Sequence, residues 1–187
     1  MKNRLYLCTI NEKELRRVWK LFSRCFKNDW YYRCCVSNFK SIKKAVLECL
    51  KEHLSFGVYV NRKLIGVLLA IDYRKIKSDI ERYKTVLVID SIDEIPYPRL
   101  WEKLESISGK IIYIPAIFVH KKYRRQGLAS AMLDSIILKQ QMQCYYYDEK
   151  ITIASDVSNP LTLPMYERRG FDVINMGDNY SLVLCEL

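Results

Sequence analysis

Histidine is scarce in this sequence, and the cysteine patterns that hold metals are missing. The chain has only two histidines, His53 and His120, and none of its seven cysteines stands in a Cys-x-x-Cys pair. Structural zinc sites are built from such pairs and from histidines. We therefore expect no metal site, and we expect the cysteines to be reduced, mostly buried thiols.

Long apolar runs are also missing. No run approaches the roughly 18 residues that a membrane-spanning helix requires. The residues after Met1 lead directly into a short strand-like run and a charged helix, without the hydrophobic segment of a signal peptide. These absences predict a cytoplasmic protein without membrane contact.

The length and composition are those of one folded domain. The chain has 187 residues, 50% of them hydrophobic, and neither a repeat nor a low-complexity segment is present. We expect residues 1–187 to form a single domain with a full core. The net charge of +10 is concentrated in residues 1–50, which hold 12 Lys and Arg against 4 Asp and Glu. Such an excess can steer anionic ligands, or it can simply be a solvated helix surface.

Hydrophobic periodicity predicts two helices and three strands in the amino-terminal part. A short strand is expected at residues 5–9, and apolar residues recur at helical spacing within 12–26 and 41–53. Two apolar runs, 56–60 and 64–71, flank a three-residue polar turn and predict a hairpin. The second run is apolar on both faces, which favours a central position in a sheet.

Residues 113–140 combine a strand, a basic loop and a helix. An apolar run that ends at Val119 predicts the strand, and apolar residues recur at helical spacing from Leu128 onward. The first amides of a helix have no internal hydrogen-bond partner, so a helix start suits a phosphate group. Gly127 would let a ligand approach the backbone closely. An ordinary connection with solvated basic side chains would show the same pattern.

This loop resembles the acyl-CoA-binding motif of the GNAT superfamily of N-acyltransferases, Gln/Arg-x-x-Gly-x-Gly/Ala. The matching residues are Arg124, Arg125, Gln126, Gly127, Leu128 and Ala129. A second stretch resembles another GNAT signature, in which an asparagine is followed seven residues later by a tyrosine and then by Gly-Phe. It is matched by Asn159, Tyr166 and Gly170-Phe171, after a predicted strand at 151–155. Two motifs in the family's order identify the chain as a member.

The resemblance implies an α/β (α+β) fold of the GNAT type. Its central sheet is mixed but mostly antiparallel, has about six to seven strands flanked by helices, and is splayed between the fourth and fifth strands. Residues 72–110 match the family poorly, which indicates an insertion. Pro115 lies in the fourth strand and predicts a bulge or an unpaired edge. Pro164 disfavours helix before it, so the short helix that carries Tyr166 is expected to begin near Leu163.

The resemblance also implies acetyl transfer from acetyl-CoA, bound as a cosubstrate, to a primary amine through a ternary complex. Backbone amides would hold the pyrophosphate, namely those of Arg125, Gln126, Gly127, Leu128 and Ala129. The side chain of Arg124 would supply positive charge. Backbone groups of Phe118 and Val119 would pair with the pantetheine arm, and Asn159 would hydrogen-bond its amide. Tyr166 would protonate the departing thiolate, for which a tyrosine pKa of about 10 is suited.

The general base and the acceptor are not identified by the sequence. Asp156 and water held by backbone carbonyls are both candidates for the base. The expected partner is a small-molecule or peptide amine, and a homodimer is left open. Two alternatives remain: a non-catalytic acyl-CoA-binding or regulatory module, and a nucleic-acid- or ribosome-associated protein. No nucleic-acid motif accompanies the basic charge, so a nucleic-acid partner is not expected.

Overall fold

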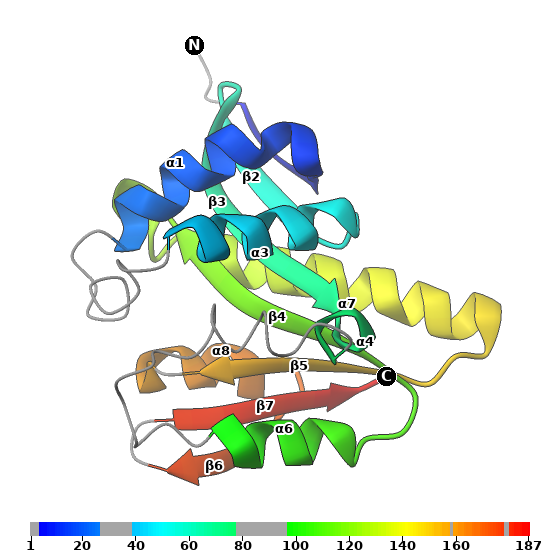
Figure 1. Ribbon diagram of the computed structural model, residues 1–187. Coiled ribbons are helices and arrows are strands. Elements are labelled where there is room, and N and C mark those ends of the chain that lie inside the picture. The colour runs from blue at the N-terminus through cyan, green and yellow to red at the C-terminus, as the bar shows by residue number, and fades with distance from the viewer. Residues whose placement is uncertain (1–3, 27–38, 78–96, 158, 178–179) are drawn as a thin grey trace.

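The computed structural model describes residues 4–26, 39–77, 97–157, 159–177 and 180–187. A seven-stranded sheet, in the order β1-β2-β3-β4-β5-β7-β6, forms the centre of the molecule (Figure 1). Its strands are β1 (Leu5–Thr9), β2 (Phe56–Val60), β3 (Lys63–Asp72), β4 (Lys110–Val119), β5 (Ile151–Val157), β6 (Asp172–Gly177) and β7 (Tyr180–Glu186). All neighbours are antiparallel except the parallel pair β4–β5. The predicted mixed, mostly antiparallel sheet is confirmed.

Helices cover both faces of the sheet. They are α1 (Leu15–Phe26), α3 (Phe39–Lys51), α4 (Tyr73–Lys77), α6 (Tyr97–Glu105), α7 (Leu128–Tyr147) and α8 (Leu163–Glu167), with short 3₁₀ turns η1 (Glu12–Glu14), η3 (Lys121–Tyr123) and η4 (Pro160–Thr162). Apolar side chains of α1, α3 and α6 pack on one face, called the α1 face below. Those of α7 and α8 pack on the other, the α7 face. Figure 1 shows these two layers in front of and behind the sheet.

The predicted hairpin between β2 and β3 is confirmed. Asn61 and Arg62 have φ values of 48° and 64°, which are the left-handed conformations of a tight hairpin turn. Every residue of β3 from Leu64 to Asp72 is buried, so its position between β2 and β4 explains why its sequence is apolar on both faces.

The helix predicted from Leu128 to about Gln140 is seven residues longer and ends at Tyr147. Its predicted buried stripe is confirmed, since Leu128, Met132 and Ile136 are all buried against the sheet. The added turns end in three exposed tyrosines, of which Tyr145 is 85% exposed. Their side chains therefore do not continue the buried stripe from which the helix was predicted. The helix predicted at 41–53 lies two residues earlier, as α3. The helix predicted at 12–26 is formed by η1 followed by α1, with Asn11 accepting a hydrogen bond from the Lys13 amide at the start of η1.

The region 72–110 is described only in part. Helix α4 occupies its beginning. The sequence also predicts a helix around residues 100–106, and α6 confirms it, begins three residues earlier and packs on the α1 face through Leu100 and Leu104. The apolar run at 86–89 lies outside the described residues. None of the described helices is long and apolar enough to cross a membrane.

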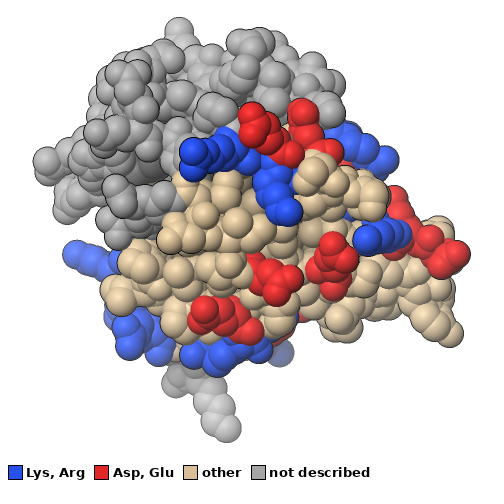
Figure 2. Space-filling model, turned by 90° about the horizontal axis from the view of Figure 1, so that it is seen from below, with Lys and Arg blue, Asp and Glu red and all other residues tan. Residues whose placement is uncertain are grey.

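Charge is distributed differently over different surfaces. Exposed arginines and lysines, namely Arg16, Arg17, Lys20 and Arg24, line the outer side of α1. On the face seen from below, positive and negative side chains are interspersed among uncharged ones (Figure 2). The excess of positive charge in residues 1–50 is thus carried, as far as these residues are described, largely by side chains on a solvated helix surface.

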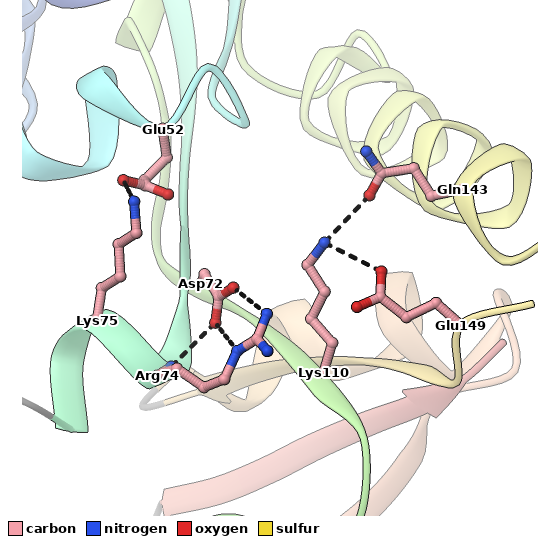
Figure 3. Close-up of polar contacts among 7 residues, drawn as sticks. All are labelled: Glu52, Asp72, Arg74, Lys75, Lys110, Gln143 and Glu149. Atoms are coloured by element: carbon pink, nitrogen blue, oxygen red, sulfur yellow. Dashed lines mark hydrogen bonds and ion pairs between the residues drawn. The ribbon is translucent and has the colours of Figure 1, made fainter. Parts of the chain in front are cut away.

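Polar contacts tie together the end of the sheet where β4 and β5 begin (Figure 3). The ammonium of Lys110 donates to Gln143 and lies 3.3 Å from a carboxylate oxygen of Glu149. The Lys110 amide donates to the carbonyl of Lys150 at 3.0 Å. Nearby, Arg74 donates to both carboxylate oxygens of Asp72 at the end of β3. The two parallel strands therefore start side by side.

Candidate active site

Strands β4 and β5 separate after five residue pairs, and the space between them is called the fork below. Their register runs from Lys110↔Ile151 to Ile114↔Ser155, and β4 then continues to Val119 paired only with β3. Figure 1 shows the two strands diverging. The predicted splay between the fourth and fifth strands is therefore confirmed.

A bulge in β4 coincides with the start of the fork. The register with β3 shifts from Leu69↔Ala116 to Ile71↔Tyr113, so β4 has one more residue than β3 there. Ile114 and Pro115 occupy this position. Because proline has no N–H, the bulge leaves no backbone donor of Pro115 unsatisfied. The bulge predicted at Pro115 is confirmed.

The backbone beyond the bulge alternates between β3 and the fork. The His120 amide donates to the carbonyl of Ile65 at 2.8 Å, and alternate residues of an antiparallel strand bond to the same neighbour. Phe118 therefore directs its N–H and C=O toward β3, and Ile117 and Val119 direct theirs toward the fork. Sequence reasoning did not include Ile117, because the alternation cannot be counted before the register is known.

The side chain of Phe118 joins an aromatic cluster on the α1 face. Its ring meets those of Phe22 and Phe26 edge-on, with centroid distances of 5.5 Å and 5.7 Å. Phe118 is 4% exposed. This packing holds the end of β4 against α1, and it therefore fixes the position of the strand that borders the fork.

Tyr166 reaches the fork from the α7 face. It lies in α8, which begins at Leu163 as predicted, and its hydroxyl is 3.3 Å from the hydroxyl of Ser155. Burial raises the pKa of Tyr166 to about 12, the hydrogen bond with Ser155 acts in the opposite direction, and the charge of Asp156 raises it further. The phenol is therefore held neutral, with its proton on oxygen.

Ser155 connects Tyr166 to the point where the strands part. Its hydroxyl donates to the carbonyl of Ile114 at 2.9 Å. Because a hydroxyl has one hydrogen, its oxygen is left to accept from Tyr166. Sequence reasoning missed Ser155; a polar residue at the end of the predicted strand 151–155 was the available signal.

Asp156 lies on the other face of the same strand. Successive side chains of a strand point to opposite faces, so Asp156 is directed to the α1 face and its neighbour Ser155 to the α7 face. The hydroxyl of Tyr113 donates to the carboxylate of Asp156. The fork is thus bordered by a neutral phenol on one face and a carboxylate on the other.

The basic loop places the start of α7 beside the end of β4. Arg125 and Gly127 both have left-handed backbones, with φ values of 62° and 76°, and non-glycine residues in this conformation are strained. The first helical hydrogen bond runs from the Ala131 amide to the Gly127 carbonyl, so the amides of residues 128–130 precede it. Left-handed residues and a helix start are compatible with an anion site.

The loop's predicted residues differ in exposure. Arg124, Arg125, Gln126 and Gly127 are exposed, Leu128 is buried and Ala129 is half-buried. No heavy atom of the described residues lies within 4 Å of a Cβ built on Gly127, so open space adjoins the loop. Arg124 donates from Nε to the Val119 carbonyl at 2.9 Å, which connects the loop to the fork-facing backbone.

Asn159 lies just beyond the end of β5. Its side-chain oxygen accepts from the Leu161 amide at 3.1 Å, and its carbonyl accepts from Thr162. These bonds start η4 and lead the chain into α8. Asn159 is exposed, and its contact with a pantetheine amide stays a prediction.

No group of three or more His, Cys, Asp or Glu side chains suited to a metal ion occurs within the described residues. Cys8, Cys25, Cys49, Cys144 and Cys185 are free thiols there. Cys34 and Cys35 lie outside the described residues.

Comparison with known proteins gives one family and one fold. The sequence model of the acetyltransferase (GNAT) family matches residues 15–171. No curated protein matches the sequence. Three similar solved structures show the same fold at low sequence identity. They are an agmatine N-acetyltransferase mutant (TM-score 0.70, 9% identity, covering 98% of this chain and 99% of that one), the polyamine N-acetyltransferase of Drosophila melanogaster (0.68, 10%, 98% and 100%) and a mosquito arylalkylamine N-acetyltransferase-like protein (0.67, 13%, 98% and 100%).

Proposed function

The chain belongs to the GNAT acetyltransferase family, and we propose that it transfers an acetyl group from acetyl-CoA to a primary amine. Both substrates would be bound together in a ternary complex. The observation that carries this proposal is the fork, where β4–β5 pairing ends at Ile114 and Ser155 and the hydroxyl of Tyr166 lies 3.3 Å from Ser155. An extended thioester arm between the strands would bring its sulfur to a proton donor.

Acetyl-CoA would be held along β4 and at the start of α7. Its pantetheine arm would pair with the fork-facing groups of Ile117 and Val119 like an added strand. Its pyrophosphate would accept from amides between Arg125 and Ala129. The open space beside Gly127 supports this placement, and the exposed Arg124 and Arg125 would add positive charge.

The chemistry would need an oxyanion donor and a proton donor. As the amine attacks the thioester carbonyl, negative charge develops on its oxygen, and a fork-facing amide of Ile117 or Val119 could stabilise it. The C–S bond then breaks, and Tyr166 would give its hydroxyl proton to the sulfur. Tyr166 would recover a proton from the nitrogen, through solvent.

The raised pKa of Tyr166 makes the proton transfer from its phenol to the sulfur dependent on Ser155. A thiol has a pKa of about 8.5, so a phenol of pKa about 12 would donate uphill by roughly 5 kcal/mol. A hydrogen bond that Ser155 donates to the phenolate lowers the pKa of Tyr166. Once the phenol loses its proton, Ser155 could turn its hydrogen from Ile114 to the phenolate, which would reduce this cost.

The acceptor class is supported by the similar structures only at the level of amines. Their names specify agmatine, polyamine and arylalkylamine acetylation, so we propose a small primary amine, with a peptide amine as the other candidate. Identities of 9% to 13% do not transfer any one of these acceptors.

The proposal is tested first by calorimetric titration with acetyl-CoA, with dephospho-CoA and ATP as controls. Micromolar binding, followed by release of free thiol in the presence of agmatine, spermidine, tyramine or an amino-terminal peptide, is the expected result. Failure to bind acetyl-CoA would overturn the proposal. Binding without acetylation of any amine would instead indicate a non-catalytic acyl-CoA-binding module.

A further inference from the structure

Two neighbouring residues of β5 border the fork from opposite faces. Ser155 meets the hydroxyl of Tyr166 on the α7 face, and Asp156 receives the hydroxyl of Tyr113 on the α1 face. Ser155 belongs to the last residue pair between β4 and β5, so Asp156 is the first residue of β5 beyond that pairing. Its backbone therefore lies where the strands begin to separate.

Tyr113 holds this carboxylate from within the core. The ring is fully buried, at 0% exposure, on the α1 face, while Asp156 is only partly buried. Tyr113 pairs with Ala154 in β5 and with Ile71 in β3, and it directly precedes the bulge. Its hydroxyl is thus fixed by the same register that produces the fork.

A purely structural role would be to satisfy the buried hydroxyl of Tyr113. A backbone carbonyl would do this without bringing a charge into a partly buried position, which costs solvation free energy. A carboxylate adds negative charge where the fork begins, on the face opposite Tyr166. The arrangement separates a group that holds a proton from a group that attracts a cation.

We infer that the carboxylate of Asp156, positioned by Tyr113, binds the ammonium group of the acceptor and takes the proton that the amine must lose. The inference rests on the proposed acetyltransferase function and adds to it the acceptor's entry face and class. The acceptor is a cationic primary amine that enters from the α1 face. Acetyl-CoA occupies the fork between it and Tyr166.

Asp156 and Tyr166 together account for the two protons that the amine loses. The ammonium passes one proton to Asp156, and the neutral nitrogen then forms the C–N bond. As the C–S bond breaks, the sulfur takes the proton of Tyr166, and the nitrogen loses a second proton that restores the phenol. The products are the amide and free CoA, with one net proton that leaves Asp156 for solvent.

The test compares Asp156→Asn and Tyr113→Phe with the wild type and with Asp148→Asn. Asp148 is exposed at the end of α7 in a left-handed conformation that asparagine tolerates, so its variant removes the same charge elsewhere. The probe pair is tyramine and tyrosol, in which a hydroxyl replaces the amino group. Each is titrated by calorimetry into protein saturated with CoA, and acetylation of tyramine, agmatine and spermidine is followed by thiol release.

We expect Asp156→Asn to bind acetyl-CoA within about 2-fold of the wild type while kcat/KM for amines falls about 100-fold. Its preference for tyramine over tyrosol is expected to disappear. Tyr113→Phe should raise KM more than it lowers kcat, since the carboxylate remains but is less well placed. Asp148→Asn should match the wild type in all three measurements.

The inference is overturned if Asp156→Asn keeps the amine preference and kcat/KM, or if the wild type binds CoA but does not distinguish tyramine from tyrosol. Should Asp156→Asn not fold, Asp156→Glu and Tyr113→Phe decide: unchanged amine preference and unchanged KM in both overturns it. The proposed function fails separately, by the absence of acetyl-CoA binding in the wild type.

Discussion

The hydroxyl of Ser155 donates a 2.9 Å hydrogen bond to the carbonyl of Ile114, its register partner in β4. This is the last residue pair before the strands separate, so a side-chain hydrogen bond lies where the backbone pairing of β4 and β5 ends. The oxygen of Ser155 then remains available to Tyr166. One residue therefore links the geometry of the fork to its proton donor.

Replacing Ser155 by alanine should slow acetyl transfer without weakening acetyl-CoA binding. The variant removes the hydrogen bond that lowers the pKa of Tyr166, so the phenolate formed during transfer loses a donor. We expect kcat to fall about 10-fold, equivalent to one hydrogen bond of about 1.4 kcal/mol. The measurement is steady-state kinetics alongside calorimetric affinity.

Ser135→Ala is the matched control, because Ser135 also donates to a backbone carbonyl at 2.9 Å but lies half-buried on α7. It should leave kcat unchanged. Equal kcat values for the Ser155→Ala variant and the wild type would remove Ser155 from the mechanism.

Tyr166→Phe should abolish most turnover while keeping acetyl-CoA affinity. The phenylalanine ring preserves the edge-on contact with Phe171, whose centroid is 5.3 Å away, so α8 should remain in place. Loss of a positioned proton donor typically costs about 10² to 10⁴ in rate. Kinetics of thiol release and calorimetry with acetyl-CoA provide the comparison.

Tyr146→Phe is the control for this change, since Tyr146 is 69% exposed at the far end of α7. Its kinetics should equal those of the wild type. If Tyr166→Phe also retains full turnover, Tyr166 is not the proton donor and its burial is only structural.

The pH dependence of kcat offers an independent test of Tyr166. Burial raises its pKa to about 12, so the phenol remains protonated throughout the range from about pH 6 to 10. We expect no alkaline decline of kcat in that range. A decline with an apparent pKa near 10 that disappears in Tyr166→Phe would show that the phenol titrates at its ordinary value in the ternary complex.

The fold was largely predictable because its signals are local or belong to a motif. Alternating and helical apolar spacing located β2, β3 and the buried stripe of α7, and Pro115 marked the bulge because proline cannot donate to a ladder. The carboxyl-terminal extension of α7 was not predictable, since most side chains of its last turns are exposed and Cys144 alone among their apolar side chains packs against the core.

The candidate site was predictable only in part, for a different reason. Motif spacing pointed to Tyr166 and to the Arg124–Ala129 loop. The roles of Ser155 and Ile117 and the contact between Tyr113 and Asp156 depend instead on strand register. A register shift of one residue would exchange the two faces of β5 and move Ser155 away from Tyr166. Sequence alone does not specify pairing between strands about 40 residues apart.

Gly127→Ala should weaken acetyl-CoA binding, whereas Gly170→Ala should not. Both glycines have left-handed backbones, with φ values of 76° and 77°, and no heavy atom of the described part of the chain lies within 4 Å of a Cβ added to either. Each variant should therefore lose a similar stability of about 1 kcal/mol from backbone strain alone. Only Gly127 lies in the loop proposed to hold the pyrophosphate.

The two variants are compared by chemical unfolding and by titration with acetyl-CoA. Similar unfolding midpoints with a selective loss of affinity in Gly127→Ala are expected. Equal affinities would mean that the loop does not approach the ligand closely, and the phosphate site would have to be sought elsewhere on the surface.

Stability should depend on the ionisation of Asp72 at acid pH. Burial would raise the pKa of Asp72, but hydrogen bonds and charge from Arg74, with a contribution from Lys110, hold it below the ordinary value. The folded state therefore favours the carboxylate, so its contribution is complete above the unfolded pKa and is lost as the pH falls through the lower folded value. Because the Arg74 side chain is 64% exposed, we expect less than about 1 kcal/mol.

Unfolding free energies between about pH 2 and pH 7 measure this contribution for the wild type, Asp72→Asn, Arg74→Gln and the double variant. Arg74→Gln removes the donors that lower the pKa of Asp72, so the acid loss of stability should begin at higher pH. In the Asp72→Asn background the same change should leave the pH dependence unaltered, because no carboxylate remains at that position. A shift of the acid limb by Arg74→Gln in both backgrounds would show that Arg74 acts through a group other than Asp72.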